Sequence, residues 1–215
     1  MTSPPASLRS ILGQAPVIAI LRGLAPEEAA DVATALLAAG IRLIEVPLNG
    51  ARAADAIARL TAGDAPTASI GAGTVVDWRD VAALPALGCR YIVTPNLDPE
   101  VIAAAIDHGL ESIIGVATPS EAFKALACGA TMLKMFPAEQ MSPAVLKAWR
   151  AVLPPGTGLI PVGGVTPETA PSWLAAGAAG VALGSALYSP SRQPRLAADA
   201  LLGCSRLIAG RIGQA

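Results

Sequence analysis

Hydrophobic and polar positions along the chain define two kinds of alternating segment. Short apolar runs bounded by Gly or Pro are typical of buried strands, and longer stretches with apolar residues three or four positions apart are typical of amphipathic helices. The predicted strands are 16–21, 41–46, 68–71, 90–94, 110–116, 131–136, 159–163 and 180–184. The predicted helices are a short one ending near Gly13, and then 26–39, 51–62, 77–87, 99–108, 119–127, 142–153, 167–176 and 196–208.

The boundaries of these elements carry the expected local chemistry. Pro followed by Glu opens the helices at residues 26, 99 and 167, and glycines at 40, 88, 109, 129 and 177 stand where helices should end. Eight strand-like runs alternating with helices predict a single (β/α)8 TIM barrel spanning residues 1–215, with a short N-terminal helix. A doubly wound open sheet is the alternative, but no GxGxxG motif opens a first helix.

Composition narrows the class of protein. The chain is 53% hydrophobic and 14% charged, which suits a large core, and its net charge of −1 offers no broad basic surface for nucleic acid. Its odd set of scattered cysteines (Cys89, Cys128 and Cys204) argues against a disulfide framework or a zinc site and suits a reducing compartment. The N-terminal residues lack a signal core and no apolar stretch reaches membrane-spanning length, so we expect a cytoplasmic protein without a membrane partner.

A lysine stands in the middle of one predicted buried strand. Lys134 lies within the apolar run that ends at Pro137, whereas Lys124 and Lys147 lie in amphipathic helical segments. Burial disfavours a charged ammonium and lowers its pKa, which yields a neutral amine able to attack a ketone and form a Schiff base. The alternative is an ordinary lysine that extends to the strand end or pairs with a carboxylate. The lone histidine, His108, rules out a histidine-rich metal site and suits the end of a helix.

Glu45 is the one carboxylate in the middle of an apolar strand, since Glu111 lies at a strand start. Burial would raise the pKa of Glu45 toward neutrality, so that one carboxyl group could both accept and return a proton. The alternative is a buried ion pair with an arginine. Strands two and six stand roughly opposite in an eight-stranded ring, so Glu45 and Lys134 could share one mouth.

Other candidate residues follow the carboxyl ends of the predicted strands, where barrel enzymes place their chemistry. Arg22 could clamp a carboxylate, or could be a surface arginine. Gly71-Ala72-Gly73-Thr74 could approach a small anion closely. Gly163-Gly164 and Gly184-Ser185 follow strands seven and eight, where such barrels often bind phosphate, although each pair alone is more often a tight turn.

These residues carry a family resemblance. Lys-x-Phe-Pro-Ala-Glu (134–139), Gly-Ala-Gly-Thr (71–74), Val-Thr-Pro-Asn (93–96) and Val-Gly-Gly-Val-Thr-Pro-Glu (162–168) resemble the class I aldolases that act on 2-dehydro-3-deoxy-6-phosphosugar acids. The likeness runs from about residue 16 to residue 188, with every motif in order. Leu21-Arg22-Gly23, Glu45-Val46-Pro47-Leu48-Asn49 and Val162-Gly163-Gly164 are more similar to the branch acting on the galactonate epimer than to the gluconate branch.

The resemblance implies a role for each residue. Lys134 would form the Schiff base with the C2 ketone, and Glu45 would move protons through a water. Arg22 and Thr74 would hold the substrate carboxylate, and Gly163, Gly164, Gly184 and Ser185 would hold the 6-phosphate. Pro95, Phe136 and Val162 complete the predicted substrate-binding set. The products would be pyruvate and glyceraldehyde 3-phosphate, with no metal or other cofactor, and the protein would be a homotrimer.

The choice between the C4 epimers is expected to involve Val162. A threonine at this position could hydrogen-bond one configuration of the C4 hydroxyl, whereas valine cannot, so we expect relaxed discrimination. Two alternatives are the aldolase acting on the gluconate epimer and, from a different class, a phosphate-binding barrel isomerase or synthase in which Lys134 acts only through its charge. A non-catalytic binding barrel would not need a lysine and a glutamate inside apolar strands.

Overall fold

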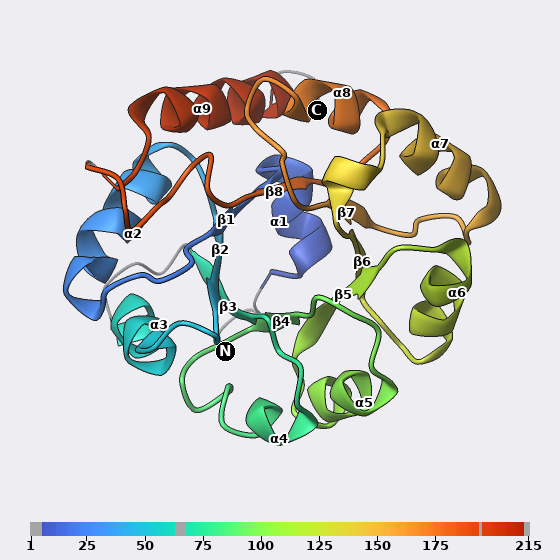
Figure 1. Ribbon diagram of the computed structural model, residues 1–215, viewed down its shortest axis with the longest axis horizontal. Coiled ribbons are helices and arrows are strands. Elements are labelled where there is room, and N and C mark those ends of the chain that lie inside the picture. The colour runs from blue at the N-terminus through green and yellow to red at the C-terminus, as the bar shows by residue number, and fades with distance from the viewer. Residues whose placement is uncertain (1–5, 63–67, 194, 213–215) are drawn as a thin grey trace.

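The computed structural model describes residues 6–62, 68–193 and 195–212. Within them, eight parallel strands follow one another around a barrel, each beside its neighbour in sequence (Figure 1). The strands are β1 (Val17–Ile20), β2 (Leu43–Pro47), β3 (Ser69–Gly73), β4 (Tyr91–Val93), β5 (Glu111–Val116), β6 (Met132–Met135), β7 (Leu159–Pro161) and β8 (Val181–Leu183). A parallel bridge between Val162 and Ala182 joins β7 to β8 and closes the ring. The predicted TIM barrel is confirmed.

Helices form the outer layer of the barrel (Figure 1). They are α2 (Ala29–Ala38), α3 (Ala53–Ala62), α4 (Trp78–Val81), α5 (Pro99–Asp107), α6 (Pro119–Ala127), α7 (Pro143–Val152), α8 (Ala170–Ala175) and α9 (Ala198–Ile212), with 3-10 turns η1 (Pro26–Glu28) and η2 (Ala138–Gln140). The five glycines expected at helix ends all have positive φ, from 68° at Gly109 to 99° at Gly177.

Three predicted helices differ from the observed ones by three or more residues at one end, and the first turn of the helix predicted over 26–39 is the 3-10 turn η1. The helix predicted over 77–87 is only α4, followed by turns, because Pro85 has no N–H to donate to the preceding turn. The helix predicted over 167–176 begins at Ala170, because Thr166 and Thr169 bond to each other's backbone instead of extending the helix. The last helix, predicted over 196–208, runs from Ala198 to Ile212.

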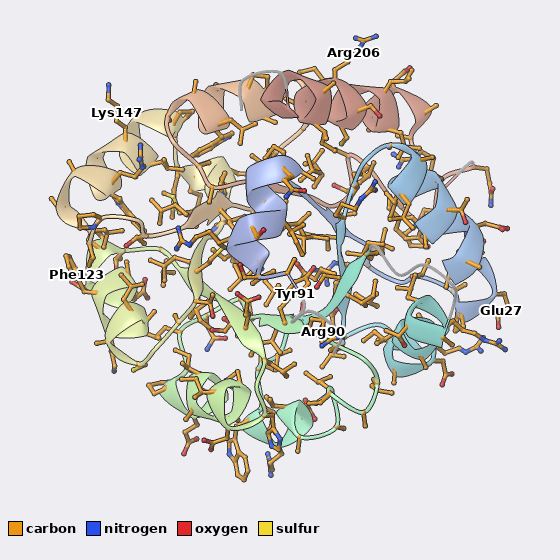
Figure 2. All side chains as sticks on the ribbon, turned by 180° about the vertical axis from the view of Figure 1, so that it is seen from behind. Glu27, Arg90, Tyr91, Phe123, Lys147 and Arg206 are labelled. Atoms are coloured by element: carbon orange, nitrogen blue, oxygen red, sulfur yellow. The ribbon has the colours of Figure 1, made fainter. Side chains whose placement is uncertain are left out.

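The N-terminal helix α1 (Leu8–Gln14) closes one end of the barrel. Leu8 and Leu12 are buried against residues of the barrel interior, and Glu111 at the start of β5 accepts a 2.8 Å hydrogen bond from the Leu8 N–H. Figure 2, from the side opposite to Figure 1, shows α1 lying across this end. Because α1 covers the amino-terminal ends of the strands, the barrel opens at their carboxyl ends.

Alternate side chains along each strand fill the barrel interior. The interior cluster contains Ile18, Ile20, Leu43, Tyr91, Val93, Ile113, Met132, Ile160, Val162 and Ala182, with Phe136 partly buried against it. Figure 2 shows Tyr91 inside the ring, while Phe123, Lys147 and Arg206 point outward. The glycines of β3 make room for their neighbours: a Cβ on Gly71 would overlap the Tyr91 ring, and one on Gly73 would overlap Glu45. Among the described residues, no helix has the length and apolarity needed to cross a bilayer.

Candidate active site at the open end of the barrel

The structure brings Lys134 and Glu45 to the same interior. β6 and β2 face each other across the ring (Figure 1). Glu45 follows inward-facing Leu43 by two positions, and Lys134 lies between inward-facing Met132 and Phe136, so period-two alternation turns both side chains inward. Lys134 is 6% exposed and Glu45 is 3% exposed. The other two lysines are exposed on the outer helices, so burial singles out Lys134.

Burial perturbs both groups in the direction that acid–base chemistry at neutral pH requires. Desolvation lowers the pKa of Lys134, and the charge of Arg22 lowers it further, while the charge of Glu45 opposes them. Desolvation also raises the pKa of Glu45, against the charges of Lys134 and Arg22. Within the described part of the chain, no direct ion pair joins these two residues. The loss of solvation therefore outweighs the mutual attraction of the pair at both groups.

Phe136 contributes to the desolvation of the lysine. Its ring centroid lies 4.5 Å from the Lys134 Nζ, and the ring is partly buried against the interior cluster. A ring face also attracts a cation, so Phe136 would stabilise a protonated imine nitrogen as well as exclude water from it. Val162, directly after β7, is buried in the same interior cluster. Its bridge to Ala182 closes the barrel.

Arg22 lies at the rim rather than inside the barrel. Its guanidinium is exposed and donates a 2.8 Å hydrogen bond to the Asn49 Oδ1, across the loops that follow β1 and β2. Its charge nevertheless affects the pKa of both Glu45 and Lys134. Arg22 can therefore receive an anion at the mouth, and Asn49, to which the sequence analysis gave no role, orients it.

Thr74 follows β3 in a backbone conformation that disfavours a β-branched residue. Its φ is +56°, and it is the one non-glycine residue with positive φ in the described part of the chain. A left-handed conformation costs roughly 1–2 kcal/mol for an ordinary residue. Such strain gathers at functional sites, where a side chain or N–H must point in a particular direction, and Thr74 stands at the end of β3 beside the mouth.

Two hydrogen bonds of one threonine side chain tie the loop after β4 to β5. The buried Thr94 hydroxyl donates to the Asn96 carbonyl at 2.6 Å and accepts from the Gly115 N–H at 3.0 Å. A Cβ on Gly115 would overlap the Pro95 backbone. Since Gly115 pairs in register with Lys134, this contact places Pro95 close to β6, the strand that carries Lys134.

Unpaired backbone donors follow β7 and β8. Within the described chain, the N–H groups of Gly164, Ser185 and Ala186 have no hydrogen-bond acceptor, whereas the Gly163 N–H takes part in the bridge between Val162 and Ala182. Gly163 and Gly164 have φ of 107° and 63°, which only glycine adopts readily. Gly184 has neither positive φ nor a tight neighbour, since a Cβ would lie 3.9 Å from the Ile20 Cβ. The lack of a packing reason for this glycine suits a ligand that approaches closely, and successive free N–H groups suit an anion.

Arg192 stabilises the loop that follows β8 through hydrogen bonds to its backbone. This role was not predicted from the sequence. Its guanidinium donates to the carbonyls of Ser185, Leu187 and Arg195 at 3.3, 2.8 and 3.0 Å. The Ala186 N–H, which belongs to the same peptide as the Ser185 carbonyl, has no acceptor in the described chain. A half-buried arginine in a loop gives no periodic signal, so the sequence pattern could not separate it from a surface residue.

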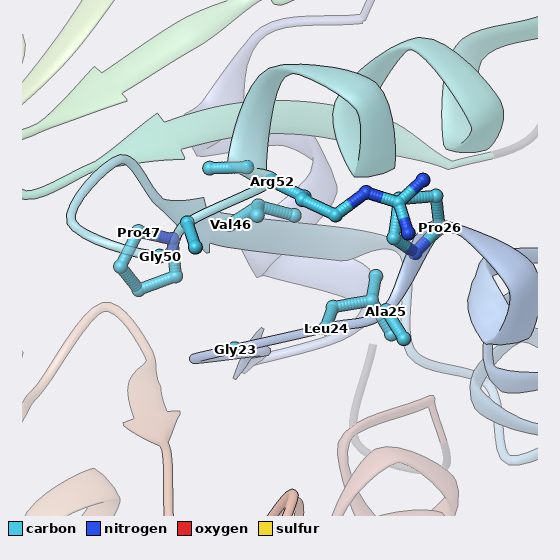
Figure 3. Close-up of a pocket in the computed structure, with 10 residues that line it drawn as sticks. Gly23, Leu24, Ala25, Pro26, Val46, Pro47, Gly50 and Arg52 are labelled. Atoms are coloured by element: carbon cyan, nitrogen blue, oxygen red, sulfur yellow. The ribbon is translucent and has the colours of Figure 1, made fainter.

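A separate cavity of about 250 Å³ lies between the loops that follow β1 and β2. Figure 3 shows its lining, with Gly23, Leu24, Ala25 and Pro26 after β1, Val46 and Pro47 at the end of β2, Gly50 in the loop that follows, and Arg52 along one side. Val46 alternates with Glu45, so this cavity lies outside the ring of strands and does not include the buried lysine. The chemistry therefore points to the barrel mouth rather than to this cavity.

A parallel barrel that gathers a buried amine, a buried carboxyl group and free backbone donors at its open end has the architecture of a TIM-barrel enzyme. The family model for "KDPG and KHG aldolase" matches residues 8–198. The chain belongs to this family, whose members are carbon–carbon lyases.

Individual relatives agree with this assignment. The chain is 45% identical to the 2-dehydro-3-deoxy-6-phosphogalactonate aldolase of Escherichia coli K12 over 80% of its length and 84% of that protein. It is 33% identical to the KHG/KDPG aldolase of the same organism, over 79% of each chain. The solved structure described as "Native KDPGal structure" superposes with a TM-score of 0.87 and 40% identity, over 92% of this chain and 96% of that one.

Proposed function

We propose that the protein is a class I aldolase that cleaves 2-dehydro-3-deoxy-6-phosphogalactonate to pyruvate and glyceraldehyde 3-phosphate. The observation that carries the proposal is the buried, pKa-lowered Lys134 facing the buried, pKa-raised Glu45. The higher identity to the galactonate enzyme, 45% against 33%, favours this epimer over the gluconate one.

In the proposed reaction, the neutral Lys134 amine attacks the C2 ketone and loses water to form an imine. Once protonated, the imine nitrogen withdraws electrons, so the C3–C4 bond can break and leave its electron pair in an enamine. Glyceraldehyde 3-phosphate departs as the aldehyde forms at C4. Protonation of the enamine at C3 and hydrolysis of the imine then release pyruvate and restore the amine.

Glu45 serves the proton transfers of this cycle. It delivers a proton to the carbinolamine hydroxyl that leaves as water, accepts the C4 hydroxyl proton as the bond breaks, and returns it to the enamine carbon. One group can do both because a raised pKa brings its two protonation states closer in energy at neutral pH than those of a carboxyl group in water. A carboxyl group in water, with a pKa near 4, would be a much weaker acid–base shuttle at that pH.

The two ends of the substrate bind at different parts of the rim. Arg22 and Thr74 hold the carboxylate, and the free N–H groups after β7 and β8, with Ser185, hold the phosphate. Pro95 and Phe136 enclose the reacting carbons, and Val162 contacts the C4 region. Because valine offers no hydrogen bond to the C4 hydroxyl, discrimination between epimers is relaxed.

Reductive trapping tests the proposal. Borohydride added with pyruvate should leave a stable adduct at Lys134, identified by peptide mass, and none at Lys124 or Lys147. An isomerase or synthase using the lysine only as a charge would give no adduct, which would reject the aldolase. The ratio of kcat/KM on the two epimeric substrates then decides between the galactonate and gluconate activities.

We further propose a homotrimer in the cytoplasm. Support for assembly comes from Val76 and Trp78, which are 54% and 50% exposed together beside α4, since apolar patches on a surface mark interfaces. Support for the compartment comes from Cys89, Cys128 and Cys204, all of which are free thiols. Light scattering on the purified protein tests the trimer, and a monomer mass at micromolar concentration would reject it.

A further inference from the structure

The side chain of Glu139 lies directly against the glycine turn that follows β7. In η2, the Ala138 N–H donates a 2.8 Å hydrogen bond to the Val162 carbonyl, which ties the loop after β6 to the end of β7. A Cβ on Gly163 would overlap the Glu139 carboxylate, and one on Gly164 would lie 2.5 Å from the Glu139 Cγ. The Glu139 side chain therefore fills the space that two ordinary side chains would occupy.

This arrangement puts a negative charge beside the free N–H groups. Gly164, Ser185 and Ala186 present donors without acceptors in the described chain. Glu139 is exposed and forms no ion pair with any described residue. With no described cation paired to its carboxylate, an incoming dianion at these donors meets a like charge.

We propose that Glu139 is a specificity-determining residue that weakens the preference of the site for a phosphorylated aldehyde over its unphosphorylated counterpart. The inference rests on the proposed aldolase function and on phosphate binding after β7 and β8. A carboxylate repels a phosphate dianion but accepts hydrogen bonds from a sugar hydroxyl. It therefore opposes one class of substrate and tolerates the other.

The size of the effect follows from the charges. A dianion about 6 Å from a carboxylate in a water-like medium changes a binding constant by roughly tenfold. Glu139→Gln removes the charge and keeps the shape that packs on Gly163 and Gly164, so the turn stays supported. Asp107→Asn is the matched control, because Asp107 is an exposed carboxylate at the end of α5, away from the open end of the barrel.

The experiment measures aldol addition at saturating pyruvate, with glyceraldehyde 3-phosphate or glyceraldehyde as acceptor. Glu139→Gln should lower the KM for glyceraldehyde 3-phosphate by about tenfold and change that for glyceraldehyde by less than about twofold. Inorganic phosphate should inhibit this variant competitively at about tenfold lower concentration than it inhibits the wild type. Asp107→Asn should change none of these values.

An unchanged or higher KM for glyceraldehyde 3-phosphate in Glu139→Gln, with its melting temperature retained, would overturn the inference. An equal fall in both KM values would overturn it as well, because a general loosening of the mouth does not discriminate by charge. Failure of the proposed function is seen separately, as the absence of a pyruvate adduct on the wild-type Lys134. Exchange of the pyruvate methyl protons needs no phosphate and should be the same in all three proteins.

Discussion

Substituting Gly73 by alanine should displace the proposed base, Glu45, while leaving that residue itself unchanged. Gly73 lies on β3 where the Glu45 side chain crosses from β2, and its φ is not positive, so alanine fits the backbone. A Cβ there would lie 2.6 Å from the Glu45 Cδ and 2.7 Å from its Cγ and would overlap its Oε1. Carbon atoms pack at about 3.5–4.0 Å, so the carboxyl group must move by about 1 Å.

A shift of this size is large for a proton-transfer group. Misplacement of a catalytic atom by about 1 Å can cost about a hundredfold in rate. We expect Gly73→Ala to lower kcat for cleavage and the rate of deuterium exchange into the pyruvate methyl group by about that factor. Overpacking should also lower the free energy of unfolding by about 1–3 kcal/mol.

Three measurements separate displacement of Glu45 from general damage. Circular dichroism checks the fold, borohydride trapping checks that the Lys134 amine still reacts, and exchange follows the base. Gly13→Ala is the control, since a Cβ there meets nothing within 4 Å. Deuterium exchange in Gly73→Ala as fast as in the wild type would contradict the geometric reasoning. Either Glu45 would not be the base, or its displacement would not affect proton transfer.

Other predictions concern separate parts of the site. The folded pKa of Lys134 lies below its ordinary value of 10.5, so the unfolded chain binds the extra proton between the two values. Relative to Lys134→Met, the free energy of unfolding of the wild type should therefore rise as the pH approaches 10.5 from below, by at most about 1.4 kcal/mol per pH unit, and a flat difference would contradict the lowered pKa. Ser185→Asp should raise the KM of the phosphorylated substrate by about tenfold with unchanged pyruvate exchange, and an equal KM would remove Ser185 from the phosphate site. Thr74→Gly should stabilise the fold by about 1 kcal/mol in a denaturant titration, because glycine relieves the left-handed strain, while raising KM; a loss of stability would show that the Thr74 side chain supports the loop.

The alternation of elements could be predicted because the strand signal is local. In an α/β fold, a run of apolar residues between Gly and Pro is stable as a buried parallel strand. Eight such runs alternating with helices predict the barrel. Lys134 and Glu45 stood out for the same reason, since a charge inside an apolar run needs a cause. Their burial and opposite pKa directions agree with that reasoning, and their catalytic roles stay predictions.

Contacts between distant segments could not be predicted from local patterns. The Thr94 hydroxyl joins the loop after β4 to β5, and Glu139 packs on glycines more than twenty positions away. The Arg192 contacts are only three to seven positions away, but they lie in an irregular loop that has no periodic pattern. The hydrophobic pattern of a sequence looks the same whether a glycine makes room for a ligand or for a neighbouring side chain. The Gly163-Gly164 pair serves packing against Glu139 in addition to its proposed contact with phosphate.

The hydrogen bond between Leu8 and Glu111 has a consequence for biosynthesis. The two residues are 103 positions apart, so α1 lacks this hydrogen-bond partner until β5 has been synthesised. During that interval the apolar side chains of Leu8 and Leu12 stay exposed to solvent on the nascent chain. Fragments that stop before residue 111 should therefore be bound by chaperones through this segment.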